Sequence, residues 1–471
     1  MAGRPGTPRI DPEALDDDRA IRRLVFNLAW PVIVENLLQT LVGVVDLLMV
    51  AQLGAAAIAG VGVSVQVLFV IFAAIAAVAT GTTVLVARFT GAGEPQNAAR
   101  VAKQSILLGI ALGVLLALFG VPGAKPLVAL LGAGPDVVEL GGGYLEIVFL
   151  TAAALTLSFV LSAALRGAGD SRSPMVVALG MNVVNVLVAY VLIFGVPALG
   201  IPAMGVVGSA WGAAAGRIFG AGALLLMVIT GLGLRGRARL DLGMGGLASW
   251  LPDVSLIGRL LKIGLPTMAE QLSRSLGMLF FSWVVISLGT QVFAAQRITF
   301  SIISLSFLPG MGFAMAATAL TGQALGARKP DRAERATWFS VRSAMLWMGS
   351  MGVIFLVTAP WLIRLFAGGE DADALVALGS PALQVLAFGQ PQVAMALVLA
   401  GGLRGAGDTR FPMLNTTLSM WLLRVPIAWI AVTQLGLGLP GAYAAFVIGS
   451  TVECFSSWLR YRTGRWRQLR V

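Results

Sequence analysis

The sequence predicts an all-α integral membrane protein with twelve transmembrane helices in two six-helix lobes around a central cavity. Three observations carry this prediction. The composition is apolar, with 58% hydrophobic and only 12% charged residues, whereas soluble domains usually carry about 25% charged residues. About twelve apolar stretches follow one another along the chain. The two halves of the chain also repeat the same motifs in the same order.

Each apolar stretch is long enough to cross the hydrocarbon layer as a helix, which takes about 20 residues. The expected helix cores are 25–50, 57–86, 103–121, 138–164, 175–195, 203–231, 261–287, 291–322, 338–363, 378–402, 413–435 and 441–459. The expected domains are an N-terminal tail (1–24), a first lobe (25–231), a linker (232–258), a second lobe (259–460) and a C-terminal tail (461–471).

The basic residues are distributed asymmetrically along this map. They gather in both tails, the linker and alternate loops, whereas the opposite side keeps Lys125 and Arg364. Cationic segments stay on the cytoplasmic side of a membrane. We therefore expect a multi-pass protein of the cell's inner (plasma) membrane with both termini in the cytoplasm. The net charge of +11 then reflects topology and contact with lipid headgroups, and we expect no nucleic-acid partner.

Several chemistries lack the residues they need. The chain has one cysteine, Cys454, and no histidine, which argues against a disulfide framework, a multi-cysteine metal site and a Ser-His-Asp arrangement. No P-loop motif is present, which disfavours ATP-driven transport by this chain. We expect a protein that is not an enzyme and has no cofactor.

The internal repeat is clearest in one loop motif. Arg-Gly-Ala-Gly-Asp at 166–170 recurs at 404–408, an offset of 238 (404 − 166). Upstream the offset is 235, so that Pro31 corresponds to Pro266 and Glu35 to Glu270. Each half starts on the cytoplasmic side, so the halves are parallel repeats. Folds of this kind place substrate between the halves and rock one half against the other.

The repeated loops have a structural interpretation. Glycine permits a tight turn with positive φ, and Pro174 and Pro412 suit the first turn of the next helix. The charged residues can pair with one another and with carbonyl groups at helix ends. We expect the following loop residues to brace the cytoplasmic side: Arg166, Asp170, Arg172, Arg404, Asp408 and Arg410.

These motifs resemble the multidrug and toxic compound extrusion (MATE) family, in particular its DinF-like branch. The similar stretches include LAWPVIVENLLQTLVGVVDLLMVAQLG (28–54), ALRGAGDSRSPM (164–175), IGLPTMAEQ (263–271) and LRGAGDTRFPMLNTTLSMWLLRVPIA (403–428). The resemblance implies export of amphipathic organic cations and related compounds, coupled to inward flow of H⁺ or Na⁺.

Asp46 is the leading functional candidate, because an ionisable side chain inside a membrane costs about 2.5–3.5 kcal/mol on insertion scales. Gln39 and Glu35 precede it by seven and eleven residues, which places all three on one helix face. Desolvation disfavours the charged form of a carboxylate, so Asp46 can exchange H⁺ as access alternates. The alternative is a purely structural pairing of Asp46 with a polar neighbour.

By resemblance, the family's first-lobe cation site corresponds to Gln39, Asp46 and Asn185, with Asn182 one turn before Asn185. The family's usual second acid falls at Ala189, and an expected threonine falls at Ala213. Na⁺ is a hard cation that takes several oxygen ligands. One carboxylate with amides offers fewer of them, so we favour H⁺ over Na⁺ as the coupling ion.

The second half differs at the corresponding position, where Phe281 matches Asp46. Glu270 can pair with Arg274, four residues later. Arg217, Arg297 and Arg424 lie within or near spans, where we expect them to reach lipid headgroups or to bind carbonyl groups. Candidate residues of a substrate cavity are Glu35, Glu270, Phe281, Gln66, Gln296, Met311 and Met315.

The sequence therefore favours a secondary active exporter of organic cations that works by alternating access as a monomer in membrane lipid. A flippase for lipid-linked precursors is the alternative within the same superfamily, and it expects a strongly cationic cavity. A membrane-embedded enzyme is a more distant alternative.

Overall fold

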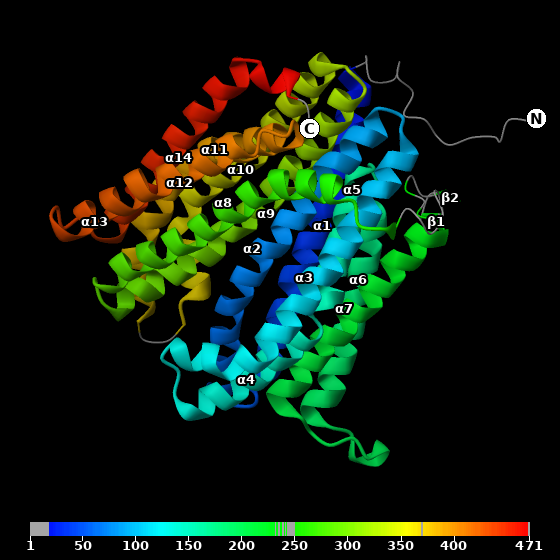
Figure 1. The fold of residues 1–471 in the computed structure, drawn as a ribbon. Helices are drawn as coiled ribbons and strands as arrows, with labels where there is room; N and C mark the ends of the chain where they lie inside the picture. The colour runs from blue at the N-terminus through cyan, green and yellow to red at the C-terminus, as the bar shows by residue number, and fades with distance from the viewer. Residues whose placement is uncertain are drawn as a thin grey trace, which may run out of the picture. The chain divides into compact units, whose positions relative to one another are not determined.

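The computed structural model describes residues 18–230, 232–233, 236–237, 240, 242, 250–368 and 371–469. Most of the predicted tail 1–24, much of the linker 232–258 and the last two residues of the tail 461–471 lie outside these ranges. The described chain is almost entirely helical (Figure 1). Its only described strands, β1 (Leu232–Gly233) and β2 (Gly236–Arg237), form a short antiparallel pair within the predicted linker.

The helices confirm the predicted fold class and the twelve spans. Nine are single continuous helices: α1 (Asp18–Ala51), α2 (Ala55–Gly91), α3 (Pro95–Leu130), α6 (Arg172–Phe194), α7 (Gly205–Thr230), α8 (Val254–Ile286), α9 (Thr290–Gly326), α10 (Pro330–Phe366) and α11 (Ala372–Gly405). The twelfth span is α14 (Gly438–Arg462), and short 3-10 turns lie at Pro197–Leu199 and Arg465–Gln468.

The remaining two spans are interrupted helices. The fourth consists of α4 (Pro135–Leu150) and α5 (Ala152–Gly167), which meet at a bend of 56°. The eleventh consists of α12 (Arg410–Leu418), one π-helical turn at Ser419–Arg424, and α13 (Val425–Thr433). By length and hydropathy, nine helices in the described ranges can cross a membrane, or ten with the bent pair. The helices α8 and α14 are long enough to cross but more polar.

The chain divides into two compact units that differ from the predicted lobes in two segments. Within the described ranges, the first unit comprises residues 34–265, and the second comprises residues 18–33 and 266–469. Residues 25–33 were expected in the first lobe and residues 259–265 in the second, and the two compact units place them the other way round. The lobe boundaries stay a prediction. Each first helix of a repeat therefore begins in one unit and continues in the other. The change falls close to Pro31 in α1 and at Pro266 in α8.

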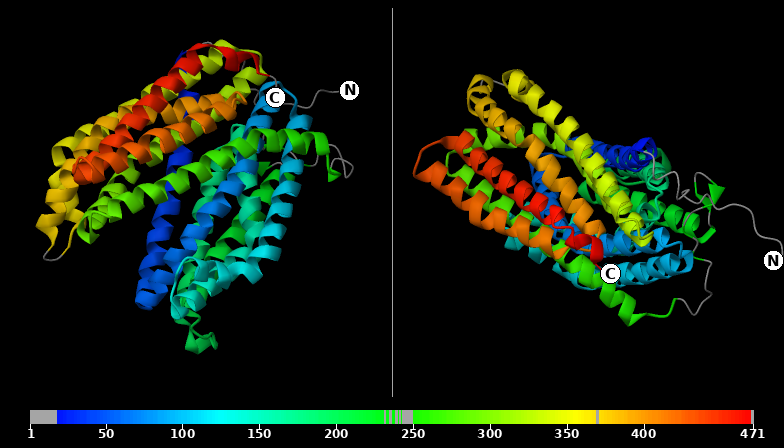
Figure 2. Two further views of the ribbon diagram at one scale, coloured as in Figure 1. Left: turned by 60° about the vertical axis from the view of Figure 1, so that its left-hand side comes forward. Right: turned by 90° about the horizontal axis from the view of Figure 1, so that it is seen from above.

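Each unit has its own apolar core. In the first unit, α2, α3, α4 and α5 pack together, and α6 lies against α7 along its length. In the second unit, α9, α10 and α11 pack against one another, and α13 and α14 run side by side (Figures 1 and 2). Apolar residues also remain exposed along many helices, as expected for surfaces that face lipid.

The start of α8 is fixed to the first unit by polar contacts and by close packing. Asp253 caps the helix, because its Oδ1 accepts the backbone N–H of Leu256 at 3.1 Å. Buried Gln104 donates to the carbonyl of Leu251 at 2.8 Å and accepts the N–H of Asp253 at 3.0 Å. Further along, the carbonyl of Leu260 lies against Gly81, where an added Cβ would sit only 2.5 Å from it.

The start of α1 is held in the second unit in a comparable way. Its apolar residues join a core cluster with α9, α10 and α11, and the Phe26 ring meets the ring of Phe313 edge-on at 5.9 Å. Gly312 of α9 lies against Ala29 and Ile33 of α1. The repeat relates this contact to one in the first unit, where Gly264 of α8 lies against Ala77 of α2.

The two contacts use repeat-related positions, but glycine and alanine have changed places between them. Gly264 corresponds to Ala29 (264 − 29 = 235), and Gly312 corresponds to Ala77 (312 − 77 = 235). In both units a glycine on one helix faces an alanine on the other, so the backbones approach closely. Both repeats therefore have the same close helix contact, but the glycine comes from α8 in the first unit and from α9 in the second.

Replacing Gly264 by Ala should destabilise the first unit by about 1–3 kcal/mol, because the added methyl group meets the Ala77 carbonyl backbone. The matched control is Gly258→Ala in the same helix, where nothing lies within 4 Å. That control should stabilise by about 0.5–1 kcal/mol through helix propensity. Thermal unfolding of the two purified variants measures the difference, and equal melting temperatures would contradict the proposed close approach.

Candidate functional site

Asp46 lies in the last turns of α1 and is half-buried in the first unit. Its Oδ2 accepts a hydrogen bond from Nδ2 of Asn185 on α6 at 3.1 Å. Its Oδ1 is buried and has no hydrogen-bond partner among the described residues. A buried carboxylate oxygen without a partner is costly, and it gains most from binding a proton or a cation.

Two asparagines on α6 hold the second part of α1. Asn185 reaches Asp46, and Asn182, three residues earlier, donates to the carbonyl of Leu38 at 2.9 Å. The structure thus brings two of the four predicted coupling residues, Asp46 and Asn185, into contact, and Asn182 holds the same helix about two turns earlier. Gln39, the fourth, lies on the exposed side of α1 and makes no hydrogen bond to the described residues. Its predicted part in the site stays a prediction.

Close packing of α6 on α7 explains the small residue at the position of the usual second acid. Ala189 is fully buried, and a Cβ added to Gly212 of α7 would lie 2.5 Å from the Ala189 Cβ. The backbones touch here, so a carboxylate side chain at position 189 would have to push α7 away. One helical turn later, Gly216 packs against Asn185 in the same manner. The site therefore has one carboxylate.

Two further polar side chains surround Asp46, and the sequence did not identify them as partners. Arg217 of α7 interacts electrostatically with Asp46 and with Tyr144 of α4. The Arg217 Nη1 atom is buried and has no hydrogen-bond partner in the described part of the chain. Tyr144 is also buried. An arginine in the middle of an apolar span was the available signal, because such a residue needs a partner.

A buried ion pair joins the two repeated motifs of the first unit. Nη1 of Arg166, from the Arg-Gly-Ala-Gly-Asp loop, lies 3.2 and 3.1 Å from the two carboxylate oxygens of Glu35. Both side chains are about 10% exposed. Glu35 was predicted to line a substrate cavity, but its carboxylate is committed to this pair, which fastens α1 to the end of α5.

The same pair recurs in the second unit. Nη2 of Arg404 lies 2.6 Å from Oε1 of Glu270, which also accepts from Nη2 of Arg274 at 3.3 Å. The predicted pairing of Glu270 with Arg274 is therefore present. Glu270 was also predicted to line a cavity, and its carboxylate is instead buried between two arginines. The first unit has Gln39 at the position that matches Arg274 (274 − 235 = 39).

The two loop aspartates make different contacts. Asp170 caps α6, because its Oδ1 accepts the N–H groups of Arg172 and Ser173 at 3.1 and 3.0 Å. Asp408 instead binds Arg460 of α14 at 2.8 Å. The expected positive φ is present at the equivalent glycines, with 90° at Gly169 and 89° at Gly407. Arg410 is exposed on the first turn of α12.

The remaining cavity candidates have different environments. Phe281 is 1% exposed and lies in the core of the second unit beside the Tyr443 ring, so its predicted place in a cavity was wrong. Its side chain packs against other apolar residues of that core. Gln296 is buried, and its Oε1 has no partner among the described residues. Met315 is half-buried, whereas Gln66 and Met311 are exposed, and these stay candidates.

A buried network in the second unit was missed by the sequence reasoning. Arg424 lies at the end of the π-helical turn, and its Nη2 contacts Oε2 of Glu453 on α14 at 2.6 Å. Thr416 donates to the other Glu453 oxygen at 2.8 Å, and the Phe446 ring lies 4.4 Å from the guanidinium. Arg424 is therefore paired inside the unit, not extended to headgroups. The signal available in the sequence was Glu453, an acid within the last apolar stretch (441–459), which needs a partner.

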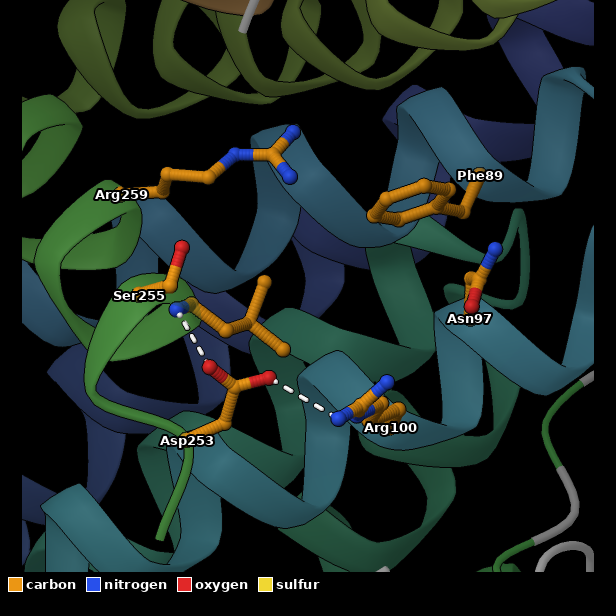
Figure 3. Close-up of a pocket in the computed structure, with 7 residues that line it drawn as sticks. Phe89, Asn97, Arg100, Asp253, Ser255 and Arg259 are labelled. Atoms are coloured by element: carbon orange, nitrogen blue, oxygen red, sulfur yellow. Dashed lines mark hydrogen bonds and ion pairs between the residues drawn. The ribbon is translucent and has the colours of Figure 1, made fainter.

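A separate pocket of about 270 Å³ lies where α8 begins on the first unit (Figure 3). Arg100 of α3 and Asp253 form an ion pair of 3.1 Å at one side of it. Arg259 lies across the pocket, with its guanidinium 5.8 Å from the Phe89 ring centre. These contacts anchor α8, and Asp46 is not among the residues that line the pocket.

In the described residues, no group of three or more cysteine, aspartate or glutamate side chains could hold a metal ion. The groups described around Asp46 are its own carboxyl, which can exchange a proton, and the amide of Asn185, whose oxygen is a cation ligand type. The expected central cavity between the lobes stays a prediction, because each unit is described by itself.

Twelve membrane-spanning helices in two sequence repeats, with polar side chains held inside each repeat, define a multi-pass membrane transporter. The sequence pattern of the MatE family matches residues 31–191 and again 266–430, and the two starts differ by the repeat offset of 235 (266 − 31). The chain belongs to the MATE family. The finer assignment to a DinF-like branch stays a prediction.

Similar proteins cover nearly the whole chain. A probable multidrug resistance protein NorM of Thermotoga maritima is 30% identical over 455 residues, covering 96% of this chain and 94% of that protein. The uncharacterized transporter YisQ of Bacillus subtilis is 28% identical over 444 residues, covering 94% of this chain and 95% of that protein.

Solved structures also match. An outward-facing multidrug resistance MATE transporter of the MOP superfamily matches with a TM-score of 0.87 and 25% identity, covering 98% of this chain and 100% of that one. A MOP superfamily transporter from Pyrococcus furiosus, described as having a binding pocket of reverse polarity, matches with a TM-score of 0.88 and 25% identity over the same shares.

Replacing Glu35 by Gln should lower stability by about 3–5 kcal/mol, because it leaves Arg166 buried without its partner charge. The matched control is Glu139→Gln, which breaks the exposed ion pair between Glu139 and Lys125 and should have little effect. Thermal unfolding in detergent distinguishes the two variants. A Glu35→Gln protein as stable as the control would show that the buried pair does not fasten α1.

Proposed function

We propose that this protein exports amphipathic organic cations and related small molecules across the cell's inner (plasma) membrane in exchange for protons. It works by alternating access, as a monomer, with both termini in the cytoplasm. The single observation that carries the coupling proposal is the environment of Asp46. One of its oxygens binds Asn185, and the other is buried without a hydrogen-bond partner among the described residues.

The donor set supports H⁺ as the coupling ion more than Na⁺. A proton needs one carboxylate, which Asp46 provides. Na⁺ takes several oxygen ligands, and the packing of Gly212 against Ala189 leaves no room for a second acid. Na⁺ coupling is the second candidate and is tested in the same experiment.

The proposed cycle uses the charge of Asp46. Protonation from the outside neutralises the carboxylate, which weakens its attraction for a cationic substrate and changes how α1 packs against α6. Release of the proton to the cytoplasm restores the charge and the affinity for substrate. An ion shifts a conformational equilibrium only by its differential affinity for the two states. A partly buried carboxyl provides such a difference, because its neutral and charged forms differ strongly in desolvation cost.

The substrate class is supported by the relatives whose names specify multidrug resistance. A lipid-precursor flippase would need cationic groups that are free to bind phosphate. In the second unit Arg404 and Arg424 are each bound to a glutamate at 2.6 Å, which favours the drug exporter.

Replacing Asp46 by Asn should reduce proton-driven efflux to the level of protein-free liposomes, because the amide cannot take up and release H⁺. The measurement is the initial rate of ethidium movement in proteoliposomes with a pH gradient, and separately with a Na⁺ gradient. The matched control is Asp136→Asn at the exposed start of α4, which should transport like the wild type. Normal proton-driven efflux by the Asp46→Asn variant would refute the proposed coupling.

A further inference from the structure

The pocket at the start of α8 is lined mainly by polar side chains of the first unit. Five of its described lining residues are polar or charged: Asn97, Arg100, Asp253, Ser255 and Arg259. Arg100 and Arg259 lie on opposite sides of it (Figure 3). Its volume of about 270 Å³ is below the range of about 300–1,000 Å³ that is typical of sites for drug-sized ligands. The pocket therefore suits a small polar group.

The pocket lies at the level of the lipid headgroups. On α3, no charged residue lies between Lys103 and Lys125, which are about 33 Å apart along the helix at 1.5 Å per residue. This length matches a hydrocarbon layer about 30 Å thick. On α2, the uncharged stretch ends at Arg88, next to Phe89. Arg100 and Phe89 therefore lie just beyond the hydrocarbon, at the end of the helices that we expect to face the cytoplasm.

The repeat offset of 235 shows which part of the pocket both units share. Arg100 corresponds to Arg335, since 335 − 100 = 235. Asp253 corresponds to Asp18 in the same way, since 253 − 18 = 235. The first unit's ion pair measures 3.1 Å and the second unit's pair 3.9 Å. Each pair joins the third helix of one repeat to the start of the first helix of the other, so the ion pair is an anchor common to both units.

The polar groups on α8 differ between the units. Arg259 corresponds to Leu24 of α1, since 259 − 24 = 235, and Leu24 packs against the apolar core of the second unit. Ser255 corresponds to Ala20 by the same offset. The equivalent helix contact is thus made with apolar side chains, so packing alone does not explain an arginine at position 259. A guanidinium and a hydroxyl at this level instead provide hydrogen-bond donors for a ligand.

The charges of the pocket favour an anion. Arg100 binds Asp253 through Nη2, and a guanidinium has five N–H donors. The guanidinium of Arg259 lies 5.8 Å from the Phe89 ring centre, and such a contact with a ring leaves the N–H groups at its edge able to donate. Asp253 also accepts the N–H of Leu256, so both of its oxygens are bound. Two arginines and one aspartate give the lining a net charge of +1 (2 − 1).

We propose that this pocket binds a phosphate group, either the headgroup phosphate of an anionic phospholipid or a soluble phosphate on the cytoplasmic side. Guanidinium groups recognise phosphate by charge-assisted, two-pronged hydrogen bonds. Ser255 adds a hydroxyl donor, and the start of α8 adds the positive end of the helix dipole. Asn97 donates to the exposed Glu94 at 2.7 Å, and Glu94 is not among the lining residues. A bound phosphate would connect α3 to the start of α8, and its binding does not depend on the proposed coupling at Asp46.

The test variant is Arg259→Leu, which introduces the residue that the second unit has at the equivalent position. The matched control is Arg410→Leu, which removes the same charge from an exposed position on the first turn of α12. The purified proteins are titrated in neutral detergent, at constant ionic strength, with phosphatidylglycerol and with inorganic phosphate. Phosphatidylcholine and chloride give the respective baselines. Native mass spectrometry counts bound lipid, and thermal unfolding reports the stabilisation by each probe.

The wild type and the Arg410→Leu control should bind one of the two phosphate probes above its baseline. The Arg259→Leu variant should bind that probe at least about tenfold more weakly, because charge-assisted hydrogen bonds are lost. A response to phosphatidylglycerol alone identifies the lipid headgroup as the source, and a response to inorganic phosphate identifies the soluble one.

Three results would overturn the proposed site. They are a wild type that responds to neither probe, an Arg259→Leu variant that binds as tightly as the wild type, and an equal loss in the Arg410→Leu control. If Arg259→Leu is not recovered folded, Arg259→Gln takes its place with the same expected loss, because it removes the charge and keeps a polar side chain.

Discussion

The structure of each unit depends on a buried ion pair between an early glutamate and the arginine of the Arg-Gly-Ala-Gly-Asp loop. Glu35 binds Arg166 in one unit, and Glu270 binds Arg404 in the other. Removing one partner would leave an uncompensated charge away from water, which is strongly destabilising. Each glutamate follows the point where its helix passes from one unit to the other, so the pair fixes where that helix enters its own repeat.

Both repeats have this glutamate–arginine pair, but they differ at the positions that follow the glutamate along the helix. In the first unit Gln39 and Asp46 follow the glutamate along α1. In the second unit the same positions hold Arg274, which shares Glu270, and Phe281, which is buried in the core. At these positions one repeat therefore holds a carboxylate that is bound by an amide, and the other holds an aromatic side chain packed in the core and an arginine that shares Glu270. Under the proposed function, the first repeat alone carries the coupling carboxylate, whereas both repeats keep the glutamate–arginine pair.

Much of the fold could be predicted because it follows from local composition. Apolar stretches of membrane length, repeated motifs and loop glycines predicted the twelve spans and the positive φ at Gly169 and Gly407. The compact units differ from the predicted lobes at the starts of α1 and α8, because those segments belong to units set by contacts distant in sequence. Periodicity marks which face of a helix is apolar, but it does not specify the helix that will cover that face.

At the candidate site, too, the sequence indicated which residues are polar but not which residues they contact. Asp46 and Asn185 were identified by their polarity and are bonded to each other. Arg217, Tyr144 and Glu453 were undervalued because the pairing of a charged residue depends on which helices meet. An ionisable side chain within a span requires a partner, and that requirement alone makes Arg217 and Glu453 candidates for buried pairs.

The proposed coupling at Asp46 raises the question of why this acid, and not another acid inside the lobes, would take up the ion. Glu35, Glu270 and Glu453 each contact a guanidinium within 3.3 Å, so adding a proton to them would break a pair that holds helices together. Asp46 is bound by a neutral amide, and its other oxygen makes no hydrogen bond within the described chain. No ion pair joins Asp46 to another described residue, so a proton can bind to it without breaking one of the pairs that hold the helices together, as a reversible coupling group requires.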